Sequence, residues 1–279
     1  MPLPLFVVDA FTSAPFRGNP AAVVLLDGER PVAWMQSVAA EMNLSETAFP
    51  VRSAEDRYAL RWFTPTNEVP LCGHATLATA AVLFGEGRVR SSRVTFETAS
   101  GALHVERWKD GFALSLPAYA SEPIGANDAN DAKEIVAALG VSPIDVRLGK
   151  SKARKLLVVL ESAAEVERAQ VDATKLLAAK NDLDVKGVIL SARGFADVDF
   201  VSRFFAPWLG VNEDPVTGSA HCVLAPYWSE RTKKTAMRAV QLSKRRGELE
   251  VKLEGERVVL GGRCVVVSRG ELLAEVALS

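Results

Sequence analysis

Hydrophobic and polar residues alternate with a period of two along much of the chain. The alternation is clearest in three consecutive runs, RVTFETA, ALHVER and FALSLP (93–99, 102–107 and 112–117). Successive side chains of a strand point to opposite faces, so this pattern predicts strands with one buried face. The segment KDG at 109–111 is typical of a hairpin turn. We therefore expect a chain rich in antiparallel strands.

Two segments depart from this alternation because nearly all their residues are apolar. One follows Gly73 and the other follows Gly218. A helix that is apolar on every side is buried inside a protein. Two further helices are predicted, one from Pro31 in its first turn to Asn43 at its C-terminal cap, and one over 163–180. A curved sheet wrapped around one central helix in each half of the chain would account for both patterns.

The chain also contains a repeated motif. The segments RWFTPTNEVPLCGHA (61–75) and RFFAPWLGVNEDPVTGSA (203–220) both read Arg-aromatic-Phe-x-Pro, followed by Glu-x-Pro-x-x-Gly-x-Ala. Further on, SGALHVERWKDG (100–111) aligns with RGELEVKLEG (246–255) at nearly the same offset. Ordered anchors at a nearly constant offset indicate two similar halves.

These patterns predict an α+β fold of two similar domains, with an internal duplication. The N-terminal domain is expected over 1–118 and the C-terminal domain over 119–279, with the final strand free to return to the N-terminal domain. Each domain is expected to be a curved sheet, or half-barrel, around its central helix.

Composition and charge narrow the classes of partner. The 279 residues are 48% hydrophobic and 24% charged, with a net charge of −1, as in ordinary globular proteins. This charge gives no general attraction to nucleic acid or to anionic membranes, and no apolar run approaches the ~18 residues of a membrane helix. The basic run SKRRG at 243–247 is interpreted as a solvated turn. The first residues lack the features of a signal peptide, and the three cysteines show no C-x-x-C spacing, so we expect a cytoplasmic protein with reduced thiols.

The two glycine motifs are candidate anion sites. The first N–H groups of a helix have no partner inside the helix and carry a partial positive charge. Gly73 with His74, and Gly218 with Ser219, would present such groups to a ligand. If both helix ends face one cleft, they would hold a small carboxylated substrate between the two domains. In the simpler alternative each motif only begins a helix, with Ser219 as its N-terminal cap.

Glu46 is the first candidate for proton transfer. On a strand it shares one face with the apolar residues Leu44 and Ala48. Burial would raise the pKa of this carboxyl group towards neutrality, where general acid–base catalysis works best. The alternative is an exposed glutamate on an edge strand.

Asp214 is a second candidate acid, with a turn residue before Pro215 as the alternative. His74 could also move protons near neutral pH. Cys72, His74 and the pair His221–Cys222 are also possible metal ligands, but no metal site is predicted because no carboxylate completes such a set convincingly.

At these residues the sequence resembles the phenazine-biosynthesis PhzF-like family, which shares the diaminopimelate epimerase fold. The resemblance is carried by DAFTSAPFRGNPAAVV (9–24), MNLSETAF (42–49), RWFTPTNEVPLCGHATLA (61–78) and NEDPVTGSAH (212–221). The residues of these segments are most similar to those of the widespread branch of the family found in bacteria and animals.

The resemblance implies a cofactor-independent isomerase, usually a homodimer, with its active site between two half-barrels. In the phenazine enzyme one glutamate takes a proton from a dihydroaromatic carboxylic acid and returns it, and that glutamate matches Glu46. The supporting histidine, aspartate and serine of the family match His74, Asp214 and Ser219. The carboxylate-binding backbone matches the two glycine motifs.

One position departs from the related racemases and epimerases. Those enzymes use two cysteines, one just before each helix-starting glycine. Cys72 occupies the first of these places, whereas Thr217 occupies the second. A symmetric reaction with two thiols is therefore not expected.

Three functions follow as hypotheses. The leading one is a cofactor-independent biosynthetic isomerase that moves a proton on a small carboxylate-bearing substrate, with Glu46 as the proton carrier and with His74 and Asp214 assisting. The second is an epimerase or dehydratase of a small hydroxy or amino acid that uses Cys72 as its base. The third is a metabolite- or protein-binding module without catalysis.

Overall fold

The structure is a computed structural model that describes residues 2–125, 128–151 and 153–273. The chain forms two compact units. The first runs to Ser115 and takes in the segment from Gly261 onward, and the second is Leu116–Leu260. The division thus falls close to the predicted boundary at residue 118. The last described strand, β18 (Cys264–Leu272), pairs antiparallel with the first strand, β1 (Leu3–Ala10).

The first unit is a sheet with two helices. Its other elements are β2 (Asn19–Val24), α1 (Val32–Met42), β3 (Glu46–Ala54), β4 (Arg57–Phe63), β5 (Glu68–Val69), α2 (Gly73–Gly85), β6 (Arg93–Thr98) and β7 (Gly101–Trp108). The strands β8 (Gly111–Pro117) and β17 (Arg257–Gly262) carry the chain from one unit to the other.

The second unit has the same kinds of element and more helices. In chain order they are β9 (Ser121–Pro123), α3 (Ala129–Leu139), β10 (Asp145–Gly149), β11 (Lys155–Val159), α4 (Ala163–Arg168), α5 (Ala173–Ala178), β12 (Gly187–Arg193), β13 (Phe200–Ala206), the 3₁₀ helix η1 (Pro207–Leu209), β14 (Val211–Asp214), α6 (Gly218–Thr232), β15 (Ala236–Gln241) and β16 (Gly247–Glu254).

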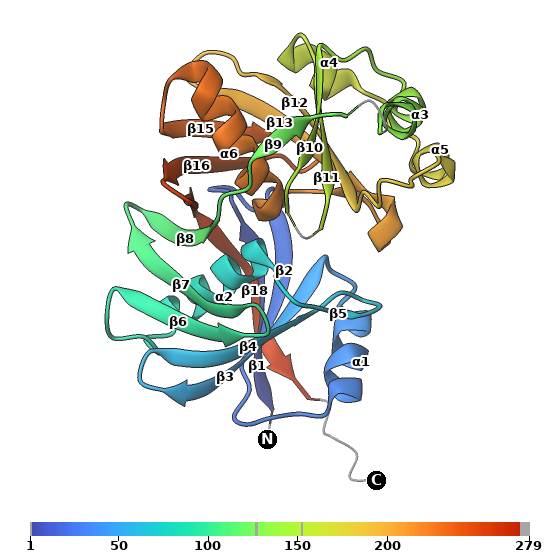
Figure 1. Cartoon of the computed structure of the whole chain (residues 1–279). Helices are drawn as coiled ribbons and strands as arrows, with labels where there is room; N and C mark the ends of the chain where they lie inside the picture. Colours follow the sequence, from blue (N-terminus) through green and yellow to red (C-terminus); the bar gives the residue numbers. More distant parts are fainter. Residues whose placement is uncertain (1, 126–127, 152, 274–279) are drawn as a thin grey trace. The chain divides into compact units, whose positions relative to one another are not determined.

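Helix α2 lies at the centre of the first unit, as its composition predicts. It packs against β1, β2, β3, β7 and β18, and almost all of its residues are buried (Figure 1). Its two threonines would be costly in such a place without partners. Their hydroxyls instead donate to the helix backbone, Thr76 to Cys72 O at 2.5 Å and Thr79 to Ala75 O at 2.7 Å. The surface that α2 presents to the sheet is therefore apolar.

Helix α6 is the buried helix of the second unit, and it contains a proline. Pro226 has no N–H, so the carbonyl of Cys222 receives no bond from within the helix. The backbone N–H of Tyr119 donates to that carbonyl at 2.9 Å. Further along, Trp228 Nε1 donates to Ser191 Oγ on β12 at 2.9 Å. Hydrogen bonds from the surrounding chain thus make a proline tolerable inside a buried helix.

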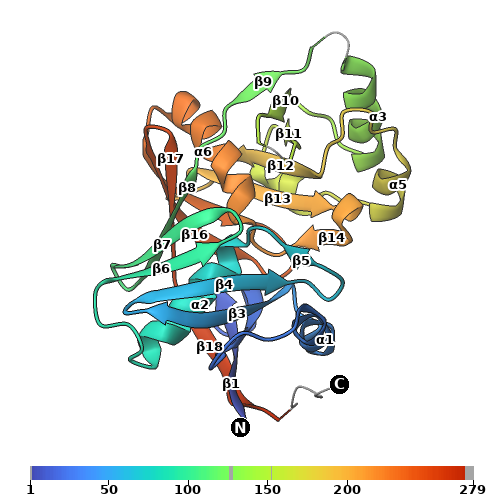
Figure 2. The same ribbon diagram turned by 60° about the horizontal axis from the view of Figure 1, so that its bottom comes forward.

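The repeated motifs lie on strands that pair in the same way. In the first unit β4 is antiparallel to β3 and β5 and parallel to β6. In the second unit β13 is antiparallel to β12 and β14 and parallel to β15. Figure 2 shows β3 and β4 crossing in front of α2, with β5 at the end of β4. The predicted α+β fold with a central helix in each unit is confirmed.

Other helices cover the outer faces of the sheets. In the first unit α1 packs through Met35, Val38 and Ala39 against a cluster that includes Phe49 and Phe63. Asn43 ends α1 in the left-handed conformation, as predicted, whereas Pro31 is its N-terminal cap rather than its first residue. Among the described residues, no helix is both long and apolar enough to span a membrane.

The prediction of one helix over 163–180 is wrong. The segment forms two short helices, α4 and α5. The Asp172 carboxylate accepts from the N–H groups of Thr174 and Lys175, at 2.9 and 3.2 Å, and so begins a new helix. A buried-face pattern alone does not reveal such an internal cap. Strand β10 and helix α3 were also missed.

Candidate active site

Glu46 and His74 meet in the first unit. Glu46 begins β3 and pairs with Ala21 of β2, and His74 is the second residue of α2. Glu46 Oε2 lies 3.2 Å from His74 Nε2, although the angles are not those of a hydrogen bond. The His74 side chain is 5% exposed and the Glu46 side chain 17%. A partly open carboxylate therefore lies against a buried imidazole.

The other ring nitrogen of His74 faces two more groups. Asn19 Nδ2 lies 3.1 Å from Nδ1, and Cys72 Sγ lies 3.5 Å from it. The tight turn at Gly18 places Asn19 beside His74 Nδ1. Gly18 has a φ of +64°, and a Cβ there would lie 2.1 Å from Ala10 O, so only glycine fits. The imidazole is thus held between strand β2 and the start of α2.

Burial determines the charge of this histidine. Because a charged imidazole is poorly solvated inside the protein, burial lowers the pKa of His74 to about 3. The ring is therefore neutral at physiological pH. It can orient or hydrogen-bond a ligand, but it does not supply a fixed positive charge beside Glu46.

Glu46, Cys72 and His74 also offer ligand atoms within 4.8 Å of one another, which is close enough to raise the question of a metal. The carboxylate, however, contacts Nε2 while the thiol contacts Nδ1. A bound ion takes one nitrogen of an imidazole. The two shortest contacts thus involve different nitrogens of the ring, and we assign no metal to this set.

The N-terminal ends of the two central helices lack side-chain caps. Cys72 precedes α2 and Thr217 precedes α6, and neither side chain bonds to the helix amides. The surface helices α4 and α5 differ, because Ser162 and Asp172 cap them in the usual way. The amides that follow Cys72 and Thr217 are thus left to other partners, and such amides favour anions.

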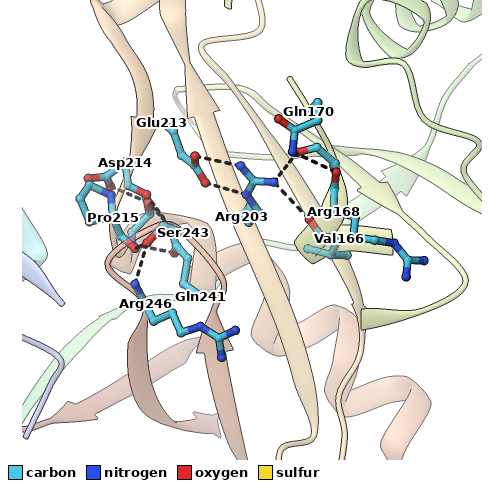
Figure 3. Close-up of polar contacts among 12 residues, drawn as sticks. Val166, Arg168, Gln170, Arg203, Glu213, Asp214, Pro215, Gln241, Ser243 and Arg246 are labelled. Carbon is cyan, nitrogen blue, oxygen red and sulfur yellow. Dashed lines mark hydrogen bonds and ion pairs between the residues drawn. The ribbon is translucent and has the colours of Figure 1, made fainter. Parts of the chain in front are cut away.

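At the start of α6 a hydrogen-bonded network holds Asp214 (Figure 3). Thr217 Oγ1 donates to Asp214 Oδ2 at 2.5 Å, and Gln241 Nε2 donates to Asp214 O at 2.7 Å. Gln241 Oε1 accepts from Thr217 N at 2.9 Å. The segment from Asp214 to Thr217 is therefore tied to the end of β15.

The repeated Arg and Glu of the two motifs form the same ion pair in each unit. Arg61 donates to both carboxylate oxygens of Glu68, each at 2.7 Å. Arg203 does the same to Glu213 at 2.7 and 2.9 Å, as Figure 3 shows. Each pair ties the strand before the loop to the loop that leads into the central helix. Paired, two-point contacts of this kind fix geometry as well as charge.

The structure thus brings together Glu46, Cys72, Gly73 and His74 in the first unit. In the second it brings together Asp214, Gly218 and Ser219. Sequence reasoning missed two side chains that hold these groups. Asn19 lies within a segment quoted for the family resemblance, so the resemblance was the available signal. Gln241 had no signal, because its role depends on a contact between β15 and a loop distant in the chain.

Comparison with known proteins gives the family. The family model described as phenazine biosynthesis-like protein (PhzC-PhzF) matches residues 8–270. The chain is 46% identical to mouse phenazine biosynthesis-like domain-containing protein 1, over 98% of this chain and 100% of the relative. It is 48% identical to a Pseudomonas aeruginosa protein named as an uncharacterized isomerase, over 98% and 99% of the two chains.

Solved structures of other proteins support this family and its fold. A PhzF-family protein of Enterococcus faecalis superposes with a TM-score of 0.88 at 42% identity, covering 98% of this chain and 100% of that one. A probable proline racemase of Agrobacterium radiobacter, 14% identical, has a TM-score of 0.63 over 99% and 93% of the chains, which shows a shared fold only. The chain therefore belongs to the phenazine biosynthesis-like, PhzC-PhzF family.

Proposed function

We propose that this protein is a cofactor-independent isomerase that moves a proton on a small carboxylate-bearing substrate. The observation that carries the proposal is the contact of 3.2 Å between Glu46 and a neutral, buried His74 at the uncapped start of α2. The naming of relatives in Pseudomonas aeruginosa and Halalkalibacterium halodurans as isomerases supports the same class of enzyme. The homodimer that the family resemblance implies and the cytoplasmic location expected from the sequence belong to the same proposal.

In this mechanism Glu46 acts as base and then as acid. Its carboxylate takes a proton from a carbon of the substrate, the electron pair shifts along the unsaturated system, and Glu46 returns a proton at another carbon. The proton can exchange with solvent while the carboxyl group holds it. No atom is gained or lost, so no co-reactant is needed. The amides of Gly73 and His74 bind the substrate carboxylate, which holds the reacting carbon beside Glu46.

Asp214, Gly218 and Ser219 are proposed to assist from the second unit. Gly218 and Ser219 present uncapped amides suited to a carboxylate, and the Asp214 carboxylate is held in one orientation by Thr217. That one substrate uses both glycine motifs stays a prediction.

The test is hydrogen exchange with solvent. Cyclic and unsaturated carboxylic acids are incubated with the enzyme in deuterated water, and loss of each C–H signal is followed by NMR. Glu46→Gln keeps size and polarity but cannot take and return a proton. General acid–base groups are worth ~10²–10⁴ in rate, so we expect at least about a hundredfold slower exchange with substrate affinity little changed.

Glu41→Gln is the matched control, because Glu41 is an exposed glutamate on α1 and receives the same chemical change. It should exchange at the wild-type rate. An active Glu46→Gln enzyme would overturn the assignment of the proton carrier. If no carboxylic acid exchanges hydrogen with the wild-type protein, the alternative of a binding module without catalysis is favoured instead.

Cys72 is the second candidate base, because its sulfur lies 3.5 Å from His74 Nδ1 at the start of α2. An epimerase or dehydratase would then use the thiol. Cys72→Ser should keep most of the exchange activity if Glu46 is the base and should abolish it if the thiol is. The two variants together separate the two enzymes.

A further inference from the structure

Thr217 occupies the N-cap position of α6 but does not cap the helix. Threonine is among the residues that cap helices well, by accepting a bond from an amide of the first turn. Its side chain makes no such bond here. The 15-residue helix α6 therefore lacks a stabilising cap that the side chain of its N-cap residue could provide.

The reason is that the Thr217 hydroxyl is engaged elsewhere. It donates to Asp214 Oδ2 at 2.5 Å and accepts from Gln241 Nε2 at 3.2 Å. With these two bonds made, the hydroxyl does not bond to the amide of Ser219, the second residue of α6, which an N-cap side chain would ordinarily hold. The glutamine therefore competes directly with the helix for the threonine oxygen.

Gln241 can do this because its amide group has a single possible orientation. Its oxygen accepts from Thr217 N at 2.9 Å, and its nitrogen donates to the carbonyl of Asp214 at 2.7 Å. Reversing the amide would set donor against donor and acceptor against acceptor. The residue is fully buried, so either mismatch would be costly.

The neighbouring turn strengthens the same contact. Ser243 Oγ donates to Pro215 O at 2.8 Å (Figure 3). The last residue of β15 and the turn after it therefore satisfy the backbone at Asp214, Pro215 and Thr217. The run SKRRG was interpreted as a solvated turn, and Lys244 is indeed exposed. Ser243, however, is buried against the loop before α6.

We propose that Gln241 is a positioning residue that keeps the start of α6 open for an anionic group of the substrate. It holds the Thr217 hydroxyl away from the helix amides and fixes Asp214 in the same step. The inference rests on the proposed function, since it assigns the open amides to the carboxylate of that substrate. It differs from that proposal in needing no proton transfer, so it can be tested without the substrate.

The experiment uses sulfate as the probe and amide NMR shifts as the readout. In the wild-type protein, sulfate should shift the amide signals of Gly218 and Ser219. Gln241→Met keeps the length of the side chain but removes its donor and acceptor, which frees the Thr217 hydroxyl to cap α6. We expect at least about tenfold weaker sulfate binding at these two amides. Sulfate binding at Gly73 and His74 should be unchanged and serves as an internal control.

A double variant distinguishes a positioning role of Gln241 from a role in stability alone. Gln241→Met combined with Thr217→Val has no hydroxyl left to cap the helix, so sulfate binding at α6 should recover even though two native bonds are lost. A role of Gln241 in stability alone predicts no recovery. Gln170→Met makes the same change at an exposed glutamine and should leave the sulfate response intact.

Gln241→Glu covers the case in which the methionine variant does not fold. The carboxylate keeps the acceptor that Thr217 N needs but lacks the donor. Sulfate binding should be weak at pH 7.5 and should recover near pH 5, because protonation of the buried acid restores one donor. Wild-type affinity in the Gln241 variants would overturn the inference, as would a wild-type protein whose Gly218 and Ser219 amides ignore sulfate. Slow exchange in Glu46→Gln would not be affected by either result.

Discussion

At the scale of single residues, burial sets the protonation state of two of the three histidines. Burial lowers the pKa of His74 to about 3 and that of His221 to about 4. His221 lies inside α6 with Nδ1 2.8 Å from Thr217 O, so it belongs to the core rather than to a metal site. His74 differs because it lies beside Glu46. A neutral ring there adds no positive charge of its own beside the glutamate, so in the proposed mechanism the carboxylate is the group that carries the proton.

Both histidines should make stability depend on pH. In the unfolded chain they bind protons near pH 6.5, whereas in the folded chain they remain neutral down to about 4 or 3. The unfolded state therefore binds more protons in this window. The free energy of unfolding should fall as pH drops from 6.5 towards 4, by up to about 1.4 kcal/mol per pH unit for each histidine.

Urea unfolding at pH 7, 6 and 5 measures this slope. Imidazole NMR signals show the cause directly, because His74 and His221 should stay in the neutral form throughout. A ring that titrates in the folded protein near pH 6.5 would contradict the expected burial effect.

Among secondary-structure elements, the Arg–Glu pair of each motif links the strand that carries the arginine to the short strand ahead of the central helix. The two copies are not equally buried. The side chain of Arg203 is 12% exposed and that of Arg61 is 40% exposed. Arg203 also donates to the carbonyls of Val166 and Ala169, at 3.3 and 2.6 Å, and so ties α4 to β13. The copy in the second unit therefore joins three elements, whereas the copy in the first joins two strands.

The two pairs should differ in their contribution to stability. Lysine cannot reproduce the two-point contact of arginine with a carboxylate. Arg203→Lys also removes the donor to the partly buried carbonyls of Val166 and Ala169, and we expect it to cost about 2 kcal/mol in the free energy of unfolding. Arg61→Lys, at a solvent-screened pair, should cost less than about 1 kcal/mol. Urea unfolding compares the two variants. Equal losses in the free energy of unfolding would show that burial of the ion pair does not govern its contribution to stability.

At the scale of the whole molecule, the chain leaves the first unit and returns to it near its end. The return passes through Gly261 and Gly262 into β18, which pairs with β1. The chain is tightly enclosed there. A Cβ on Gly261 would lie 1.6 Å from the ring of Trp108, and one on Gly262 would lie 2.5 Å from the ring of Phe11. The first unit is thus closed by a segment remote in sequence, and two residues without side chains make its passage possible.

A side chain at this crossing should destabilise the protein. Gly261→Ala forces the Trp108 ring or the strand to move, and overpacking of this kind costs about 1–3 kcal/mol. Gly270→Ala is the matched control, because a Cβ at that position of β18 meets nothing within 4 Å. The melting temperatures of the two variants, measured by thermal unfolding, test this prediction. Equal melting temperatures would mean that the crossing has more room than these distances indicate.

Features that depend on local pattern follow from the amino-acid sequence alone. The two apolar helices, most strands and the paired motifs could be predicted, because side-chain periodicity and helix-starting residues act over a few positions. Glu46, Cys72 and His74 were identified as candidates for the same local reasons. The internal cap at Asp172 was missed because a cap and a continuous helix share the same apolar spacing.

Which groups meet depends on contacts between distant parts of the chain. Asn19 reaches His74 across 55 positions of sequence, and Gln241 reaches Asp214 across 27. No periodicity encodes such pairs, since they follow from strand register and from the way each sheet curves around its helix. The neutral state of His74 was decided at the same level. The sequence suggested a histidine that titrates near neutral pH, but the packing of β2 and β3 around it removes the water that a charged ring would need.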